Sequence, residues 1–173
     1  MPGRTVRLGC ASIVALVTLV DAAASQEQAR ITRRDTYWLG AGIGAGSEDF
    51  GGQLNTSYQS GANLISFRVA STAGLFEDGF TDYGLLYGRA TQGAEERHLL
   101  AGALGVALVD GCEGGGIFSD CRDVSAVIGL PLELQAFWRP GKVVGLGIYG
   151  FANFNQSQSF AGLTVSLQVG RLR

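Results

Sequence analysis

Apolar and polar residues alternate along most of this chain. In the stretch AGLTVSLQVG, residues 161–170, alanine, leucine and valine occupy every second position, and small or polar residues occupy the positions between them. Because successive side chains of a β-strand point to opposite faces, this pattern predicts a strand with one apolar face and one weakly polar face. The pattern does not say whether the apolar face meets a protein core or a lipid bilayer.

The same alternation recurs in eight segments, with no convincing helical period between them. The predicted strands span approximately 37–46, 50–59, 63–73, 80–91, 97–109, 123–138, 143–155 and 159–171. Clusters of glycine, asparagine, aspartate and Pro-Gly separate the segments at regular intervals, as is typical of antiparallel strands that run up and down. The predicted fold class is therefore all-β, an eight-stranded antiparallel up-and-down barrel. Pro131 lies inside the sixth strand and cannot donate a ladder hydrogen bond, so we expect a bulge or kink there.

The seven connections alternate between two kinds. The second, fourth and sixth are the compact turns SGAN, QGAEE and PG, whereas the fifth is the long acidic segment DGCEGGGIFSDCR. One end of the barrel would thus carry the longest loop, and the other end would carry the short turns and both termini. Outer-membrane barrels have this asymmetry, with short periplasmic turns and longer extracellular loops.

The two faces of the predicted strands differ in charge. Well inside the strands, the less apolar faces carry only two charged residues, Arg68 and Glu133. Charged residues make up 16% of the chain, whereas about 25% is usual for soluble domains. A soluble barrel needs a charged exterior, so the apolar faces are expected to meet lipid. Arg68 and Glu133 then point into the narrow interior, where we expect each to pair with the other or with water.

Aromatic residues provide a second indication of a bilayer, because they gather at both interfaces of membrane barrels. On the predicted outward faces, one group lies toward the short turns and a second toward the long loops. The short-turn group is Tyr37, Tyr58, Tyr87 and Trp138, and the long-loop group is Phe50, Tyr83 and Phe154. Aromatic residues of a soluble sheet are usually core residues, which is the alternative interpretation. Tyr149, Phe151 and Leu86 fall on the inward faces, so the interior is expected to be partly apolar.

The first residues have the features of a secretory signal peptide. Arg4 and Arg7 precede an apolar run from Ala11 to Val20, and small residues follow up to Ala24. The apolar run is too short to cross a bilayer as a helix, which takes about 20 residues. We therefore expect a signal peptide at 1–24, a periplasmic tail at 25–36 and the barrel domain at 37–173.

The net charge gives no support to a nucleic-acid partner. Cleavage after Ala24 reduces the 13 basic and 15 acidic residues of the chain to 11 and 14, a net charge of −3. Nucleic-acid-binding domains usually carry a basic patch or stripe instead.

Cys112 and Cys121 are the two cysteines that remain after cleavage, because Cys10 leaves with the signal peptide. An even number of cysteines in an exported chain favours a disulfide. This bridge would close a small loop and add about 2–3 kcal/mol to the free energy of unfolding. Two free thiols are the alternative.

Over its whole mature part, the chain resembles the small eight-stranded outer-membrane barrels of the OmpA/OmpX-like and opacity-protein-like group. The resemblance lies in the signal peptide, the alternating segments, the unequal connections and the aromatic bands. It implies an integral protein of the bacterial outer membrane, in contact with lipid and inserted by the outer-membrane assembly machinery. Many such barrels end in an aromatic residue that this machinery reads, whereas this chain ends VGRLR. The role we expect is non-enzymatic, without a cofactor, and concerns membrane structure, surface interaction or narrow solute passage.

Acidic residues gather in the loops at the predicted external end. They are Glu48, Asp49, Glu77, Asp78, Asp82, Asp110, Glu113, Asp120 and Asp123. Carboxylates suit hard divalent cations, so these loops are a candidate cation site. The alternative is that they only solvate the loops.

Two other functions remain open from the sequence. A soluble lipocalin-like barrel would turn its leucines inward around an apolar ligand. A lipid-modifying enzyme would need a nucleophile with a base in reach, yet the only histidine is His98, at the predicted periplasmic end. No Ser-His constellation can be read around His98, which favours a turn histidine.

Overall fold

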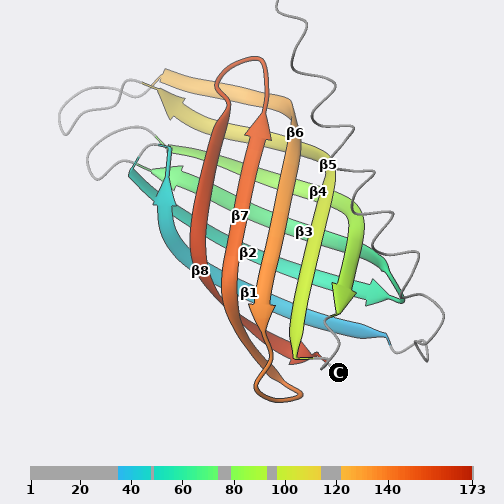
Figure 1. Ribbon diagram of the computed structural model, residues 1–173. Helices are drawn as coiled ribbons and strands as arrows, with labels where there is room; N and C mark the ends of the chain where they lie inside the picture. Colours follow the sequence, from blue (N-terminus) through green and yellow to red (C-terminus); the bar gives the residue numbers. More distant parts are fainter. Residues whose placement is uncertain (1–34, 48, 74–78, 93–96, 114–121, 173) are drawn as a thin grey trace, which may run out of the picture. The chain divides into compact units, whose positions relative to one another are not determined.

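The computed structural model describes residues 35–47, 49–73, 79–92, 97–113 and 122–172. These residues form eight strands, which pair antiparallel in chain order and close into a barrel through the pairing of β1 with β8 (Figure 1). The strands are β1 (Thr36–Gly46), β2 (Asp49–Ser60), β3 (Asn63–Ala73), β4 (Gly79–Gln92), β5 (His98–Glu113), β6 (Arg122–Trp138), β7 (Val144–Phe154) and β8 (Phe160–Arg171). The predicted all-β, eight-stranded barrel is confirmed. Among the described residues, no helix is long and apolar enough to cross a membrane.

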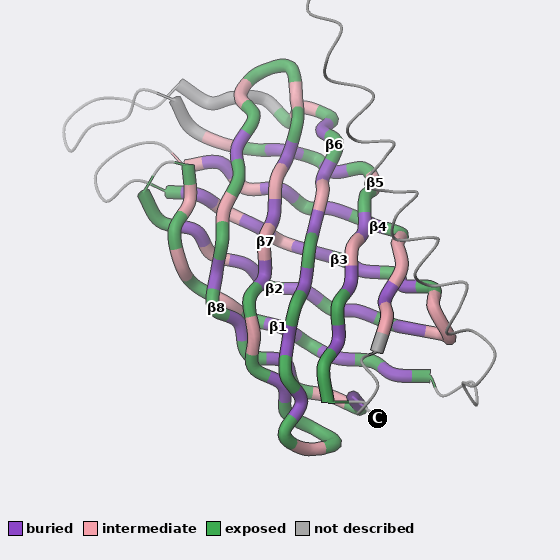
Figure 2. Tube along the Cα trace, in the orientation of Figure 1, coloured by how far each residue is buried: buried purple, intermediate pink, exposed green. Residues whose placement is uncertain are grey.

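Side chains alternate between the interior and the outer wall along the strands, as the two-residue period requires. In β8, Thr164, Ser166 and Gln168 are buried, whereas Val165 and Leu167 between them are exposed. Figure 2 shows buried and exposed segments alternating along neighbouring strands. The weakly polar face is therefore the inner face, and the apolar face is the outer one.

β1 begins and β8 ends at the barrel end that carries the short turns. Tyr37 pairs with Arg171 near this end, and the Gly170 amide donates to the Val143 carbonyl in the turn between β6 and β7. Buried Arg139, from the same turn, donates to the carbonyl of Leu172 at 2.5 Å. This turn thus holds the end of the last strand in place.

The inner face of β1 is made of glycines where the barrel is tightest. A Cβ added at Gly40 would lie 2.2 Å from the Oδ1 of Asn55, and one added at Gly44 would lie 2.1 Å from the Leu163 carbonyl oxygen. At Gly44 the close atoms are backbone, so only glycine fits there, whereas the Asn55 side chain near Gly40 can turn aside. The neighbouring strands β2 and β8 therefore pack directly over the backbone of β1.

The sheet is irregular in β6, but the register shift is not at Pro131. Val109 of β5 pairs with Val127, while Gly111 pairs with Val124, so β6 contains the extra residue between these two pairs. At Pro131 the β5–β6 ladder loses two pairs and then resumes in the same register. The expected bulge is therefore wrong in position. The lost pairing at the proline follows from its missing N–H.

Two apolar clusters lie inside the barrel, one toward each end. The first, toward the short turns, contains Trp38, Leu64, Leu86, Ala90, Leu99, Ala101, Ala103, Phe137 and Leu172. The second, toward the long loops, contains Ala70, Phe80, Val109, Tyr149, Phe151 and Phe160. Inward-facing polar residues of the central strand segments lie between these two clusters.

Several predictions fall outside the described residues. They are the signal peptide at 1–24 and nearly all of the tail at 25–36.

Candidate functional site

The outer wall of the barrel is apolar over its whole circumference. Ile43 on β1 is 81% exposed, Ile128 on β6 is 74% exposed and Val165 on β8 is 63% exposed. The wall also includes Leu39, Leu54, Ile65, Phe67, Leu85, Leu100, Leu104, Val106, Leu108, Leu130, Leu134, Leu146, Ile148, Leu163 and Leu167. A belt of this extent far exceeds the apolar patches that soluble monomers expose.

The seven aromatic residues predicted to lie at the bilayer interfaces are all exposed on this outer wall. Tyr37 and Tyr58 are direct cross-strand partners near the short turns, and Tyr87 follows on β4. Trp138 lies at the same end, whereas Phe50, Tyr83 and Phe154 lie toward the long-loop ends of their strands. Their contact with lipid headgroups stays a prediction.

Arg68 and Asp82 form an ion pair inside the barrel. The Arg68 Nη2 lies 2.5 Å from the Asp82 Oδ2, the Nε lies 3.1 Å from the Oδ1, and both side chains are fully buried. This bidentate contact corrects two predictions. Arg68 takes Asp82 rather than Glu133 as its counter-charge, and Asp82 lies in the interior rather than in an external acidic loop. The physical reason is register, because β3 and β4 are adjacent and bring the two residues together diagonally.

The remaining donors of this group cross the interior. The Arg68 Nη1 donates to the Leu132 carbonyl of β6 at 2.7 Å, and its Nη2 donates to the Ala152 carbonyl of β7 at 3.2 Å. The Asn153 Nδ2 of β7 donates to the Asp82 carboxylate at 2.9 Å. Hydrogen bonds therefore join the β3–β4 wall to the β6–β7 wall.

Glu133 belongs to a second buried group. The Tyr149 hydroxyl donates to its Oε2, the Gln135 Nε2 donates to its Oε1 at 3.0 Å, and the Ser66 hydroxyl donates to its Oε2 at 3.3 Å. The Trp38 Nε1 reaches Gln135 from β1 at 3.3 Å. Ser66 and Trp38 come from the opposite side of the barrel, so this group also bridges the interior.

The carboxylates of these two groups are paired, whereas the buried Gln53 carboxamide has no hydrogen-bond partner among the described residues. Arg68–Asp82 is an ion pair between two described residues, and among the described residues no group of three or more His, Cys, Asp or Glu side chains could hold a metal ion. His98 is exposed at the start of β5, where it pairs with Trp138. This arrangement is typical of packing, because each interior carboxylate accepts hydrogen bonds from fixed neighbours.

The sequence predicts no polar role in the interior for Asp82, Tyr149 or Asn153, although it places Tyr149 on an inward face. Asp82 is grouped with the loop acids in the sequence because it is the last residue of the acidic stretch FEDGFTD. The strand phase could have corrected this, since Tyr83 and Leu85 point outward and therefore place Asp82 inward.

The disulfide and most of the acidic loops cannot be located in the structure. Cys121 lies outside the described residues, and only the backbone of Cys112 is described. Asp49 and Asp110 are exposed toward the long-loop end. Of the other predicted cation ligands, Glu48, Glu77, Asp78 and Asp120 lie outside the described residues, and the side chains of Glu113 and Asp123 are not described. Cation binding there stays a prediction.

Several solved structures share this fold. Neisserial surface protein A superposes with a TM-score of 0.57 at 9% identity, over 78% of this chain and 94% of that one. Ail, the attachment invasion locus protein of Yersinia pestis, has a TM-score of 0.55 at 12% identity, over 81% and 99%. The N-terminal β-barrel domain of Pseudomonas aeruginosa OprF has a TM-score of 0.55 at 6% identity, over 80% and 98%. Neither a protein-family model nor a curated protein sequence matches the chain.

These similarities concern the fold. The chain has the architecture of the small eight-stranded outer-membrane barrels, as the sequence predicted.

Proposed function

We propose that this chain is a non-enzymatic integral β-barrel protein of a bacterial outer membrane. One observation carries the proposal: the outer wall of the barrel is apolar, while the interior holds buried polar and charged residues between its two apolar clusters. Water-soluble proteins have the opposite distribution, whereas a transmembrane barrel requires this one. Closure of the barrel also pairs the backbone of its strands within the sheet, as crossing a bilayer requires, apart from the two pairs missing at Pro131.

The filled interior supports a structural or surface-interaction role over solute passage. Eight strands leave room for little more than their own inward side chains. Here Arg68 and Glu133 are at most 1% exposed, and their hydrogen bonds join opposite walls between the two apolar clusters. We therefore expect no steady ion conductance when the barrel is placed in a planar bilayer.

Surface interaction is the more specific part of the proposal. The connections at the long-loop end are available for contacts outside the cell, in keeping with the names of two similar structures, a surface protein and an attachment invasion locus protein. The first binding experiments should therefore use the whole barrel with its loops intact.

The soluble lipocalin-like alternative makes the opposite prediction for the leucines. It requires Leu104, Leu134 and Leu167 to line the interior, yet each is at least 48% exposed on the outer wall. The lipid-modifying alternative would need a catalytic group near the outer-leaflet end, and His98 lies at the opposite end of β5.

Fractionation of cells that express the full-length chain tests the proposal. The protein should remain in the outer membrane after an alkaline wash and should migrate differently on a gel with and without boiling. A variant with Ile148→Asp and Val165→Asp, which places two carboxylates on the lipid face, should fail to accumulate there. Recovery of the wild-type chain in the soluble periplasmic fraction would contradict the proposal.

A further inference from the structure

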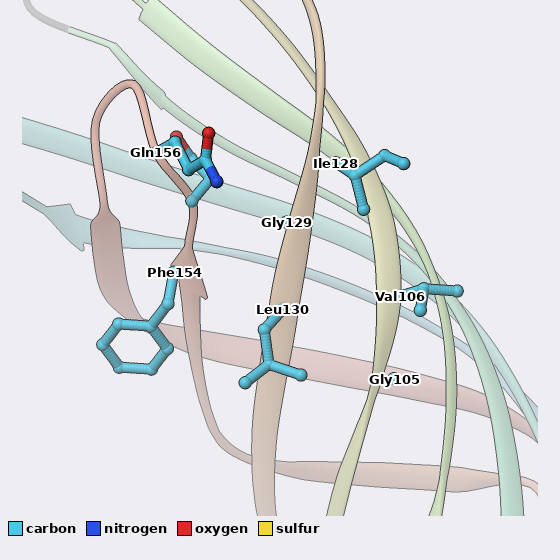
Figure 3. Close-up of a pocket in the computed structure, with 8 residues that line it drawn as sticks. Gly105, Val106, Ile128, Gly129, Leu130, Phe154 and Gln156 are labelled. Atoms are coloured by element: carbon cyan, nitrogen blue, oxygen red, sulfur yellow. The ribbon is translucent and has the colours of Figure 1, made fainter.

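The outer wall has a groove of about 500 Å³ where β5, β6 and the end of β7 meet (Figure 3). Val106, Ile128, Leu130 and Phe154 line it with apolar side chains, and Gln156 lies at its loop end. The four apolar residues are 49–74% exposed. The groove is therefore an open furrow in the wall rather than an enclosed cavity.

The groove lies where Pro131 interrupts the β5–β6 ladder. The Arg139 amide donates to the Arg97 carbonyl, so these two residues are a hydrogen-bonded pair of the ladder. Such pairs recur at every second position of an antiparallel ladder, which makes Gly105 and Pro131 a hydrogen-bonding pair in the same register. Because proline has no N–H, β6 offers no donor to the Gly105 carbonyl, and the ladder omits this pair and the next. Gly105 and Gly129, which have no side chains, contribute only backbone to the base of the groove.

The polar end of the groove is built from uncharged carboxamides. The Asn155 Oδ1 accepts the backbone amides of Ser157 and Gln158 at 2.9 and 2.8 Å, which fixes the turn. Gln156, in the middle of this turn, is exposed. The groove therefore combines an apolar body with a hydrogen-bonding group at the end nearest the long loops.

We propose that this groove holds one acyl chain of a membrane lipid, with the polar headgroup region of that lipid against Gln156. The inference rests on the proposed function, because the groove is continuous with the apolar wall that a bilayer would cover. In a bilayer, lipid chains surround this wall at high local concentration. A flexible acyl chain can follow a furrow whose base is backbone.

A second copy of the chain is the competing occupant. It would have to insert a side chain between Val106 and Leu130, and the barrel would then be a dimer. The experiment below separates the two, because a lipid and a second copy add different masses.

Native mass spectrometry of the barrel, extracted from outer membranes in a mild detergent, tests the proposal. Val106→Trp fills the groove, and Val165→Trp is its matched control, since Val165 is also a lipid-facing valine, 63% exposed against 64% for Val106. The wild type and Val165→Trp should retain one lipid per barrel. Val106→Trp should retain it at least tenfold less, with unchanged heat-dependent gel mobility.

Four results would overturn the inference: no lipid adduct on the wild type, an adduct of detergent mass only, equal retention by Val106→Trp, or a dimer that Val106→Trp dissociates. Each of them leaves the proposed function intact as long as all three proteins fractionate with the outer membrane. If the wild type is instead soluble, the proposed function fails first.

Discussion

The guanidinium of Arg68 and the carboxylate of Asp82 face each other inside the barrel, with two contacts of 2.5 and 3.1 Å and no solvent exposure. The two residues come from adjacent strands, where Ala70 pairs with Asp82 and Arg68 pairs with Gly84. The antiparallel register of these two strands brings them together, rather than a contact across the interior. A buried pair of this kind is sensitive to the loss of either partner, because the other charge then lacks compensation.

Asp82→Asn should lower the free energy of unfolding by about 3–5 kcal/mol, because Arg68 keeps its charge and loses its counter-charge. Urea unfolding of the barrel refolded in lipid vesicles measures this change. A loss below about 1 kcal/mol, the value of a solvent-exposed pair, would show that the interior pair is not buried as described.

Double-mutant cycles should give a larger coupling energy between Arg68 and Asp82 than between Arg68 and Glu133. Residues in direct contact show coupling energies of about 0.5–3 kcal/mol. The cycle uses Arg68→Met with Asp82→Leu, and in parallel Arg68→Met with Glu133→Leu. Equal coupling in the two cycles would favour the original expectation that Arg68 and Glu133 are partners.

Tyr149→Phe should destabilise the barrel by about 1.5–3 kcal/mol, because it removes a hydrogen bond to the buried Glu133 carboxyl group and keeps the ring. Tyr87→Phe is the matched control. Its hydroxyl donates to Asn63 at 3.0 Å on the outer wall, where the loss should stay below about 1 kcal/mol. Unfolding in lipid vesicles compares the two, and equal losses would argue against the Glu133 group as a stabilising centre.

Ile148→Arg should cost about 2–4 kcal/mol in a bilayer, because Ile148 lies in the middle of β7 on the exposed wall. Val144→Arg, at the short-turn end of the same strand, should cost only about 0–1 kcal/mol. Refolding equilibria in vesicles give both values. If neither substitution has an effect, the wall does not face hydrocarbon.

The mature chain should contain a disulfide between Cys112 and Cys121. Alkylation of the unreduced, denatured protein should then add no mass, whereas reduction should expose two reactive thiols. Cys112→Ser should lower the free energy of unfolding by about 2–3 kcal/mol, because it opens the closed loop. Alkylation before reduction would contradict the bridge.

The alternation of residue types was sufficient to predict the strands and their outward faces. The segment 63–73 was predicted with the bounds of β3, and Val165 and Leu167 lie outward as their phase requires. This pattern is robust because a shift of one residue would turn an entire apolar face inward. The end of β5 was predicted less well, since the strand continues through Gly111 into the acidic segment.

The pairing of interior charges could not be predicted, because it depends on register and on reach across the barrel. Arg68 and Glu133 were assigned to the inner faces from their phase, and the structure has both buried. Their partners depend on which residues of adjacent strands lie diagonally, as Gln135 opposite Tyr149 brings that hydroxyl to Glu133. Hydrophobic patterning contains no such information.

Spin labels on β8 test most directly whether the apolar wall meets lipid. Single cysteines at Leu163, Val165 and Leu167, in a mature chain with Cys112→Ser and Cys121→Ser, are labelled after the barrel is refolded in vesicles. All three labels should collide more often with oxygen, which concentrates in hydrocarbon, than with a water-soluble nickel complex. Greater access to nickel at these positions would show that the wall faces water, and the barrel would then not be a membrane protein.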